Sequence, residues 1–241
     1  MAILVGTSSK MNLTSTEAGA YLDALVPLVS DIADRELFVL LPFPAIWVAR
    51  DRLTGTNIRW GAQDVHPEDR GAHTGDVSAP MLADLGCAWI EVGHHERRRD
   101  YGETDEFVAA KVEAIQRWAM TAIVCVGEPA RLPWDGVAET LERQLRLLGR
   151  FDPGRLVIAY EPAWAIGVGA EAAPVDWVGR VHAEIHRVMG EAIPVIYGGS
   201  VSTAAAPSLL AEPGVDGLFV GRMALDPAVF AAIAHTPSER G

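Results

Sequence analysis

Eight short, continuously apolar runs recur along the 241 residues of the chain, about one every 30 residues, which is the typical length of one strand-plus-helix step. Runs that are apolar at successive positions, rather than at alternate ones, are typical of strands buried on both faces. This pattern limits the fold more than any other feature does. The predicted strands span residues 3–5, 37–41, 58–61, 88–92, 122–126, 156–160, 195–197 and 218–220.

The segments between these runs show helical periodicity. Thr104 and Asp105 offer a capping residue before one such segment, and Pro174 is placed to occupy the first turn of another. Apolar side chains recur three or four positions apart, so each segment predicts an amphipathic helix. The clearest series are Val108, Val112, Ile115 and Ala119, then Val137, Leu141, Leu145 and Leu148, and then Val178, Val181, Ile185 and Val188.

Strict alternation of strand and helix predicts an α/β fold with a parallel sheet. A doubly wound open sheet would also alternate, but eight evenly spaced strands favour closure into a parallel eight-stranded (β/α)8 barrel. The eight units use the whole length, and no linker or low-complexity stretch interrupts them. We therefore expect residues 1–241 to form a single barrel domain.

Charge and cysteine usage narrow the class of protein. The chain carries 20 basic and 32 acidic residues, a net charge of -12, and its one basic run, Arg97 to Arg99, is flanked by acids, so we expect neither nucleic acid nor a membrane as partner. No apolar run has the length of a membrane span, and the first residues do not resemble a signal peptide. Cys87 and Cys125 lie within apolar runs, which indicates buried thiols and a cytoplasmic protein.

Polar side chains follow directly after several predicted strands, and this is where the chemistry of such barrels is found. Lys10 follows the first strand, His94 the fourth and Glu161 the sixth. Each of them alone would be ordinary, because most lysines are solvated and most single histidines are structural. Together they offer a cation, an electrophile and a base at one barrel mouth, which suits removal of a proton next to a carbonyl group.

Two glycine-containing turns follow the last two strands. Gly198, Gly199 and Ser200 come after the seventh strand, and Gly221 and Arg222 after the eighth. Such turns let main-chain N–H groups approach an anion, and phosphate sites are frequent at this place in the fold. The glycine-rich stretch 165–169 predicts a loop that closes over a ligand, although it could equally be a plain connection.

Taken together, these residues and the segments around them make the chain resemble the triosephosphate isomerase family along essentially its full length. The resemblance implies a TIM barrel, normally a homodimer, that interconverts an aldose and a ketose form of a small phosphorylated sugar without any cofactor or metal. The matching segments, in order, are GTSSKMN (6–12), GAQDVH (61–66), GAHTGD (71–76), EVGHHERR (91–98), YGETDE (101–106), CVGE (125–128), AYEPAWAIGVG (159–169), YGGSV (197–201) and DGLFVGR (216–222).

The resemblance also implies roles for individual catalytic residues. Glu161 matches the general base and His94 the neutral electrophile, a pair of roles for which this family is itself a standard worked case. Lys10 matches the cation that offsets substrate charge, and Glu96 matches an acid that supports the site.

Further positions match binding residues of the family. Thr74, in the long connection after the third strand, matches a residue that reaches into the neighbouring subunit, which implies a dimer contact near the site. The positions that match the phosphate-gripping backbone are Gly167, Ser200, Gly221 and Arg222.

The chain departs from the family around this site. Ser8 stands where the family has Asn, which leaves room beside the carbonyl end of the substrate, and His95 and Arg222 replace Ser and Gly. These forms are similar to the branch that isomerises erythrulose phosphates, so a four-carbon substrate is favoured beside the triose phosphates. The remaining departures are Ser9 for Trp, and Val168, Ala170 and Glu171 for Thr, Lys and Thr in the closing loop.

Two other classes of function remain open. A barrel that binds a phosphosugar without turning it over would explain the altered loop. A metal-dependent barrel enzyme would draw on acids and histidines near the third and fourth strand ends, but His94 and His95 should diverge if that segment is extended, and no known ligand spacing appears. The candidate ligands are Asp64, His66, His73, Glu91, His94 and His95.

Overall fold

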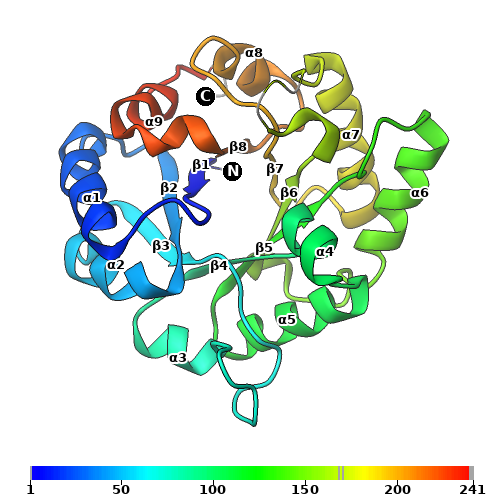
Figure 1. Ribbon diagram of the computed structural model, residues 1–241. Coiled ribbons are helices and arrows are strands. Elements are labelled where there is room, and N and C mark those ends of the chain that lie inside the picture. The colour runs from blue at the N-terminus through cyan, green and yellow to red at the C-terminus, as the bar shows by residue number, and fades with distance from the viewer. Residues whose placement is uncertain (1, 168, 170, 239–241) are drawn as a thin grey trace.

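Eight parallel strands close into a barrel in the order β1 to β8, which confirms the predicted fold (Figure 1). The computed structural model describes residues 2–167, 169 and 171–238. Closure is completed by β1 and β8, which pair through Leu4–Thr7 and Gly217–Val220. The strands are β1 (Ile3–Ser8), β2 (Arg35–Leu41), β3 (Ile58–Ala62), β4 (Trp89–Val92), β5 (Thr121–Val126), β6 (Leu156–Tyr160), β7 (Val195–Tyr197) and β8 (Gly217–Val220).

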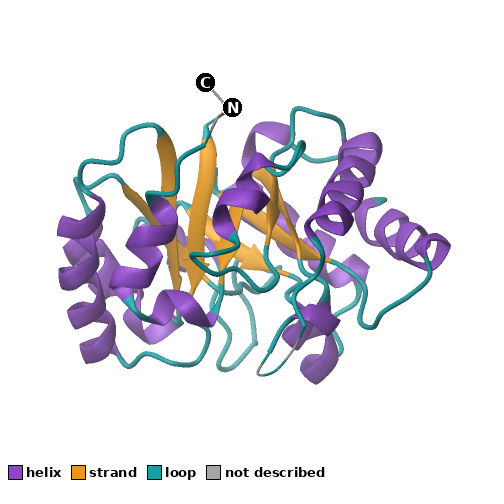
Figure 2. Ribbon diagram, turned by 90° about the horizontal axis from the view of Figure 1, so that it is seen from above, coloured by secondary structure: helices purple, strands orange, loops and turns teal. Residues whose placement is uncertain are grey.

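Helices surround the barrel, and the view from above in Figure 2 shows the strands enclosed between them. None of the helices in the described ranges has the length and apolar character of a membrane span. The α-helices are α1 (Ser15–Val29), α2 (Ile46–Leu53), α3 (Ala79–Asp84), α4 (His95–Tyr101), α5 (Asp105–Arg117), α6 (Trp134–Leu145), α7 (Val175–Met189), α8 (Ala206–Ala211) and α9 (Pro227–Ala234). Short 3-10 turns are η1 (Phe43–Ala45), η2 (Pro153–Arg155), η3 (Ala163–Ala165) and η4 (Arg222–Leu225).

Helix ends differ from the periodic pattern more than strand ends do. Thr104 caps α5, as predicted, by accepting a hydrogen bond from the backbone N–H of Phe107. The helix ends at Arg117, however, and Ala119 has a left-handed φ of 58°, so the predicted extension to this residue is wrong. Leu148 likewise lies beyond the end of α6, and Pro174 is the residue before α7 rather than part of its first turn. Leu148 is buried and still packs on the core beyond the helix end, whereas Ala119 is exposed, so its apolar spacing is not a mark of packing.

Two apolar layers hold the fold together. One lies between the outer faces of the strands and the helices. The other fills the barrel itself, where the Phe38 and Trp89 rings stack with centroids 5.0 Å apart. The barrel is therefore a packed core rather than a pore. Cys87 and Cys125 are both buried and free, as the sequence predicts.

Strand contacts inside the barrel leave no room for a Cβ at certain glycines. Gly61 of β3 pairs with Trp89 of β4, and a Cβ at Gly61 would overlap the carbonyl oxygen of Trp89. The obstacle is backbone, which cannot rotate away as a side chain can. This glycine is therefore required by the close approach of β3 and β4.

Gly61→Ala should destabilise the protein by about 3 kcal/mol, because the added methyl group forces β3 away from β4. Gly149→Ala is the matched control, since a Cβ at Gly149 meets nothing within 4 Å. The free energies of unfolding in urea provide the comparison. Equal stability of the two variants would contradict the steric argument.

Candidate active site

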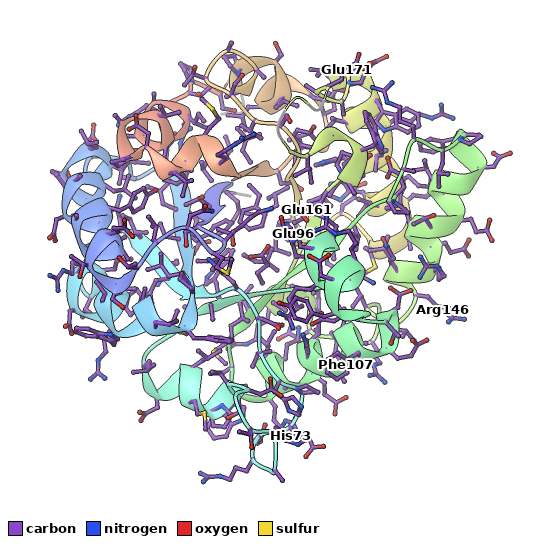
Figure 3. The ribbon with its side chains drawn as sticks, in the orientation of Figure 1. His73, Glu96, Phe107, Arg146, Glu161 and Glu171 are labelled. Atoms are coloured by element: carbon purple, nitrogen blue, oxygen red, sulfur yellow. The ribbon has the colours of Figure 1, made fainter. Side chains whose placement is uncertain are left out.

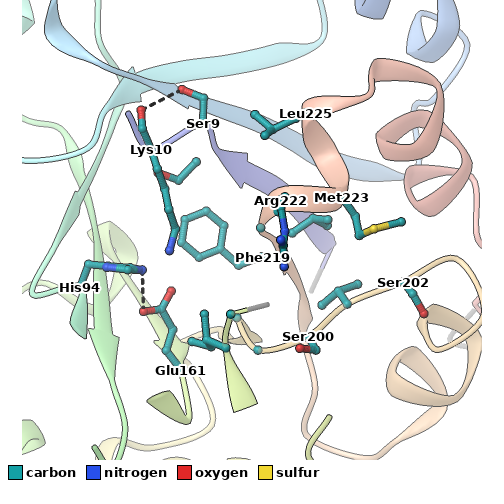
Figure 4. Close-up of a pocket in the computed structure, with 18 of the residues that line it drawn as sticks. Ser9, Lys10, His94, Glu161, Ser200, Ser202, Phe219, Arg222, Met223 and Leu225 are labelled. Carbon is teal, nitrogen blue, oxygen red and sulfur yellow. Dashed lines mark hydrogen bonds and ion pairs between the residues drawn. The ribbon is translucent and has the colours of Figure 1, made fainter. Parts of the chain in front are cut away.

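A cavity of about 550 Å³ opens at the carboxyl ends of the strands (Figure 4). Figure 4 shows Lys10, His94 and Glu161 on one side, with Ser200, Ser202 and Met223 opposite. The cavity brings together all the predicted site residues except Thr74. Those lining it are Ser8, Lys10, His94, Glu96, Glu161, Gly167, Ser200, Gly221 and Arg222.

Lys10 lies in a sharp turn directly after β1. Its φ is 51°, a left-handed conformation that is uncommon for a residue other than glycine, and the Asn12 side chain braces the turn by donating to the Ser9 carbonyl at 2.9 Å. The Lys10 ammonium donates to Glu96 Oε1 at 2.9 Å, and both side chains are partly exposed to the cavity. This pair therefore fixes a positive charge at the cavity wall.

His94 is held in one tautomer by the start of α4, of which it is the N-cap. The backbone N–H of Glu96 donates to His94 Nδ1 at 3.1 Å, so Nδ1 offers its lone pair and Nε2 carries the proton. Burial lowers the pKa of His94 to about 4, with the charge of Lys10 acting in the same direction and that of Glu161 opposing it. His94 is therefore a neutral hydrogen-bond donor at Nε2.

Glu161 follows β6, and its side chain is 5% exposed. Its Oε2 lies 3.3 Å from His94 Nε2 and 3.6 Å from His95 Nδ1. Burial alone would raise the pKa of Glu161, but His94, His95 and Lys10 outweigh it and hold the pKa below its usual value. A carboxylate that stays ionised beside the cavity can accept a proton.

His94 and His95 do not diverge, so that part of the sequence argument is wrong. Their ring centroids are 4.2 Å apart, and both rings reach the same oxygen of Glu161. The reason is that His94 ends the strand segment while His95 begins a helix, which turns the second ring back toward the first. His95 is thus a contact of Glu161 that periodicity could not reveal.

Side chains that could hold a metal occur in the described ranges in three clusters, each with its ligand atoms within 4.8 Å of one another. One of them, His66, His73 and Asp76, lies in the connection after β3. The other two share Glu161 and take in His94 with His95, or Glu91 with Cys125. Because His94 Nε2 carries a proton, it donates toward the cavity and offers no lone pair to a cation there.

Glu91 is a second buried carboxyl group at this cavity, 2% exposed, on the inner face of β4. The sequence identified it only as a possible metal ligand. Burial, and then the charge of Glu161, raise the pKa of Glu91 to about 8. At neutral pH, therefore, Glu161 is ionised and Glu91 is protonated.

The glycine turn after β7 has a role in packing that the sequence did not show. The Gly198 N–H is already used, since it donates to the Tyr160 carbonyl at 2.8 Å, so it does not serve an anion as predicted. A Cβ at Gly198 would lie 2.8 Å from Glu161 Cγ. Ser200 binds the preceding connection, the one after β6, through its Oγ, which donates to the Ala165 carbonyl at 2.7 Å. Gly198 therefore leaves room for Glu161.

The connection after β6 is anchored at its beginning by Glu128, a residue that the sequence analysis did not single out. Glu128 is fully buried directly after β5, and its carboxylate accepts from Trp164 Nε1 at 2.7 Å. Glu161 was identified because it is a polar residue directly after a predicted strand. The same criterion could have identified Glu128.

Further along this connection, Gly167 has a φ of 120°, a conformation that favours glycine, and Glu171 pairs with Arg131 at 2.6 Å. The departures expected at Val168 and Ala170 fall outside the described residues.

Thr74 lies away from the cavity of its own chain. Figure 1 shows the connection between β3 and α3 projecting from the barrel, and Figure 3 places the neighbouring His73 at the rim while Glu96 and Glu161 lie near the centre. Thr74 is exposed there. Thr74 therefore cannot contribute to the cavity of its own chain, and a role at a substrate site would have to be at the site of another molecule.

Known proteins resemble this chain in both sequence and structure. The family model described as triosephosphate isomerase matches residues 3–236. A triosephosphate isomerase of Synechococcus sp. (strain JA-2-3B'a(2-13)) is 41% identical, over 97% of this chain and 96% of its own. An L-erythrulose-1-phosphate isomerase of Rhizobium meliloti (strain 1021) is 39% identical, over 92% and 91%. The crystal structure of triosephosphate isomerase from Bartonella henselae superposes with a TM-score of 0.88 at 33% identity, covering 98% of this chain and 99% of that one.

The barrel and its polar cavity define the class of protein as a barrel enzyme with its site at the carboxyl ends of the strands. The matches over nearly the whole chain go further. The chain belongs to the triosephosphate isomerase family, and it is a sugar-phosphate isomerase.

His94 should remain neutral far below the usual range of histidine, titrating near pH 4 in an NMR titration of the folded protein. Its pKa is lowered on folding, so the unfolded chain binds this proton more readily between pH 6.5 and pH 4. The stability due to neutral His94 is thus present above about pH 6.5 and falls by up to about 3 kcal/mol as the pH drops through this window.

The control is His94→Gln, which keeps a polar side chain but does not titrate. Its free energy of unfolding should fall less steeply than that of the wild type between pH 6.5 and pH 4. Titration of His94 near pH 6.5 would contradict the assignment.

Proposed function

We propose that this chain interconverts isomers of a small phosphorylated sugar by moving one proton through an enediolate, with no metal or organic cofactor. The observation that carries this proposal is the pair formed by ionised Glu161 and neutral His94, with Glu161 Oε2 and His94 Nε2 3.3 Å apart. Substrate displaces this contact when it enters. The carboxylate then faces a C–H bond, while the imidazole N–H faces the neighbouring carbonyl oxygen.

The reaction needs one proton carried between neighbouring carbons. Glu161 takes the proton from the carbon next to the carbonyl, and His94 Nε2 donates a hydrogen bond to the oxygen that becomes negative. The hydroxyl proton borne by the first carbon moves to the former carbonyl oxygen, with His94 Nε2 giving a proton to one oxygen and taking one from the other. Glu161 then returns the C–H proton to the other carbon. Lys10 offsets the negative charge, and Glu96 positions Lys10 through their 2.9 Å contact.

The phosphate group binds on the opposite side of the cavity in this proposal. Gly221 and Arg222 follow β8, and Ser200 follows β7, so the cation and main-chain groups of these turns face one region. Gly167 lines the same cavity from the connection after β6. Among the described residues, the acidic lining residues are Glu91 of β4, Glu96 of α4 and Glu161 directly after β6, and none of them belongs to the turns after β7 and β8.

A four-carbon ketose phosphate, an erythrulose phosphate, is the favoured substrate in this proposal. Ser8, a small residue, is 8% exposed and lines the cavity near Glu91, so the space beside it can take one more hydroxymethyl group. One relative at 39% identity is an L-erythrulose-1-phosphate isomerase, which supports this choice, whereas several others are triosephosphate isomerases.

A second copy of the chain is the expected partner, and the cytoplasm the expected location. Met11 and Tyr101 are large side chains that are 97% and 71% exposed. Exposing so much apolar surface to water is unfavourable, and a contact with a second subunit would bury it. Thr74 is exposed in the connection between β3 and α3, which projects from the barrel toward where such a partner would bind (Figure 1). The two free, buried cysteines suit a reducing compartment.

Turnover of erythrulose phosphates should be at least as efficient as that of triose phosphates. The measurement is kcat/KM for both substrate types, with proton exchange followed in deuterated water. A preference for glyceraldehyde 3-phosphate greater than about a hundredfold would reject the four-carbon assignment, because it exceeds what one small group in a pocket discriminates.

Glu161→Asp should lower kcat by about a hundredfold or more, because the shorter side chain withdraws the carboxylate from the carbon that it must reach. Glu139→Asp makes the same chemical change at an exposed position on α6 and should leave kcat unaltered. A barrel that only binds the phosphosugar would have no measurable kcat, and its ligand affinity would be nearly the same in both variants.

A further inference from the structure

Glu91 is a buried carboxyl group that the proposed proton transfer does not use. It lies near the end of β4, on the strand face that points into the barrel, above the apolar layer to which Trp89 and Ile123 belong. Its side chain is 2% exposed, and what it does expose faces the substrate cavity. Glu91 is thus an acid at the floor of the cavity.

Two neighbouring side chains, those of Cys125 and Ser8, contact the Glu91 carboxyl group. The Cys125 thiol lies 3.6 Å from Glu91 Oε1, and the Ser8 hydroxyl is hydrogen-bonded to the same carboxyl group. An oxygen of Glu161 lies within 4.8 Å of both Glu91 and Cys125. A second negative charge so close to Glu161 would be repelled, which favours the protonated form of Glu91.

A merely structural role does not account for an acid at this position. The layer below is filled by hydrocarbon side chains, and a hydrocarbon side chain of similar volume would fill this place without the cost of burying a polar group. A protonated carboxyl group is both a hydrogen-bond donor and an acceptor. Those are the two functions that a sugar hydroxyl needs in a partner.

We propose that Glu91 and Ser8 form a subsite that binds the terminal hydroxymethyl group of a four-carbon sugar phosphate, and that Glu91 determines specificity for this chain length. The inference rests on the proposed function, because it assigns part of the same cavity. The phosphate binds on the side of Gly221 and Arg222, so the far end of a longer substrate extends toward Ser8 and Glu91.

The protonated acid suits this position because it binds the hydroxyl without adding charge. An ionised carboxylate here would oppose the enediolate that forms between Glu161 and His94. Ser8 contributes through its small size, which leaves space, and through its hydroxyl, which orients the Glu91 carboxyl. A three-carbon substrate would leave both groups without a ligand partner, a situation that binding sites penalise.

The test compares two inhibitors, glycerol 3-phosphate and erythritol 4-phosphate, which differ by one CHOH unit. Inhibition constants are measured on the full-length wild type, Glu91→Leu and Glu91→Gln. Leu removes the hydrogen-bonding groups, whereas Gln keeps a donor and an acceptor. We expect Glu91→Leu to weaken erythritol 4-phosphate by about tenfold relative to glycerol 3-phosphate, as expected for one lost hydrogen bond, and Glu91→Gln to restore most of this selectivity.

Ile123→Val serves as a matched control, since it alters packing inside the barrel without removing a polar group from the cavity. It should change both inhibition constants equally. If Glu91→Leu also changes both equally, the subsite is rejected, even where the wild type turns over erythrulose phosphates. If the wild type prefers triose phosphates but Glu91→Leu weakens only erythritol 4-phosphate, the substrate assignment fails while the subsite stands.

Discussion

The organisation of the site depends on keeping one carboxylate charged at the mouth of a barrel that is filled below by apolar side chains. Burial works against the charge on Glu161, and the structure compensates with His94, His95 and Lys10 around it. His94 is in turn kept neutral by its burial, and the N–H group at the start of α4 selects its tautomer. The short helix after β4 thus sets which nitrogen of His94, the proposed electrophile, carries the proton, and through His95 it contacts Glu161, the proposed base. Gly198 follows from the same constraint, because any larger residue would displace the Glu161 side chain.

Glu91 shows how that single charge limits its neighbours. Since Glu161 holds the negative charge, a second acid within reach is tolerated in its protonated form, and it then becomes a donor as well as an acceptor. In the proposed subsite, Ser8 leaves space for the substrate and Glu91 gives that space a polar surface. Under the same proposal, selection of substrate length and the ionisation of Glu161 are therefore linked through one pair of carboxyl groups.

The strands and the closed barrel could be predicted from the sequence because continuous burial leaves a direct mark on residue type. The helix ends could not, since Ala119 keeps the apolar spacing although the chain has already turned there. Lys10, His94 and Glu161 were found because the fold places strand ends together. His95 was misjudged because a helix begins at that residue, and the packing role of Gly198 depends on a neighbour 37 positions away in the chain, Glu161. Contacts of this kind, between residues far apart in the sequence, form only when the barrel has closed.

The pairing of β1 with β8 has a consequence for how the protein becomes active during synthesis. Lys10 comes from the turn after the first strand and Arg222 from the turn after the last, so the cations on the two sides of the cavity belong to opposite ends of the barrel sequence. Until residues 217–220 have left the ribosome, β1 and β7 are open sheet edges and no complete cavity exists. A nascent chain is therefore exposed to aggregation before it can bind any substrate, and ligands cannot assist folding until its final steps.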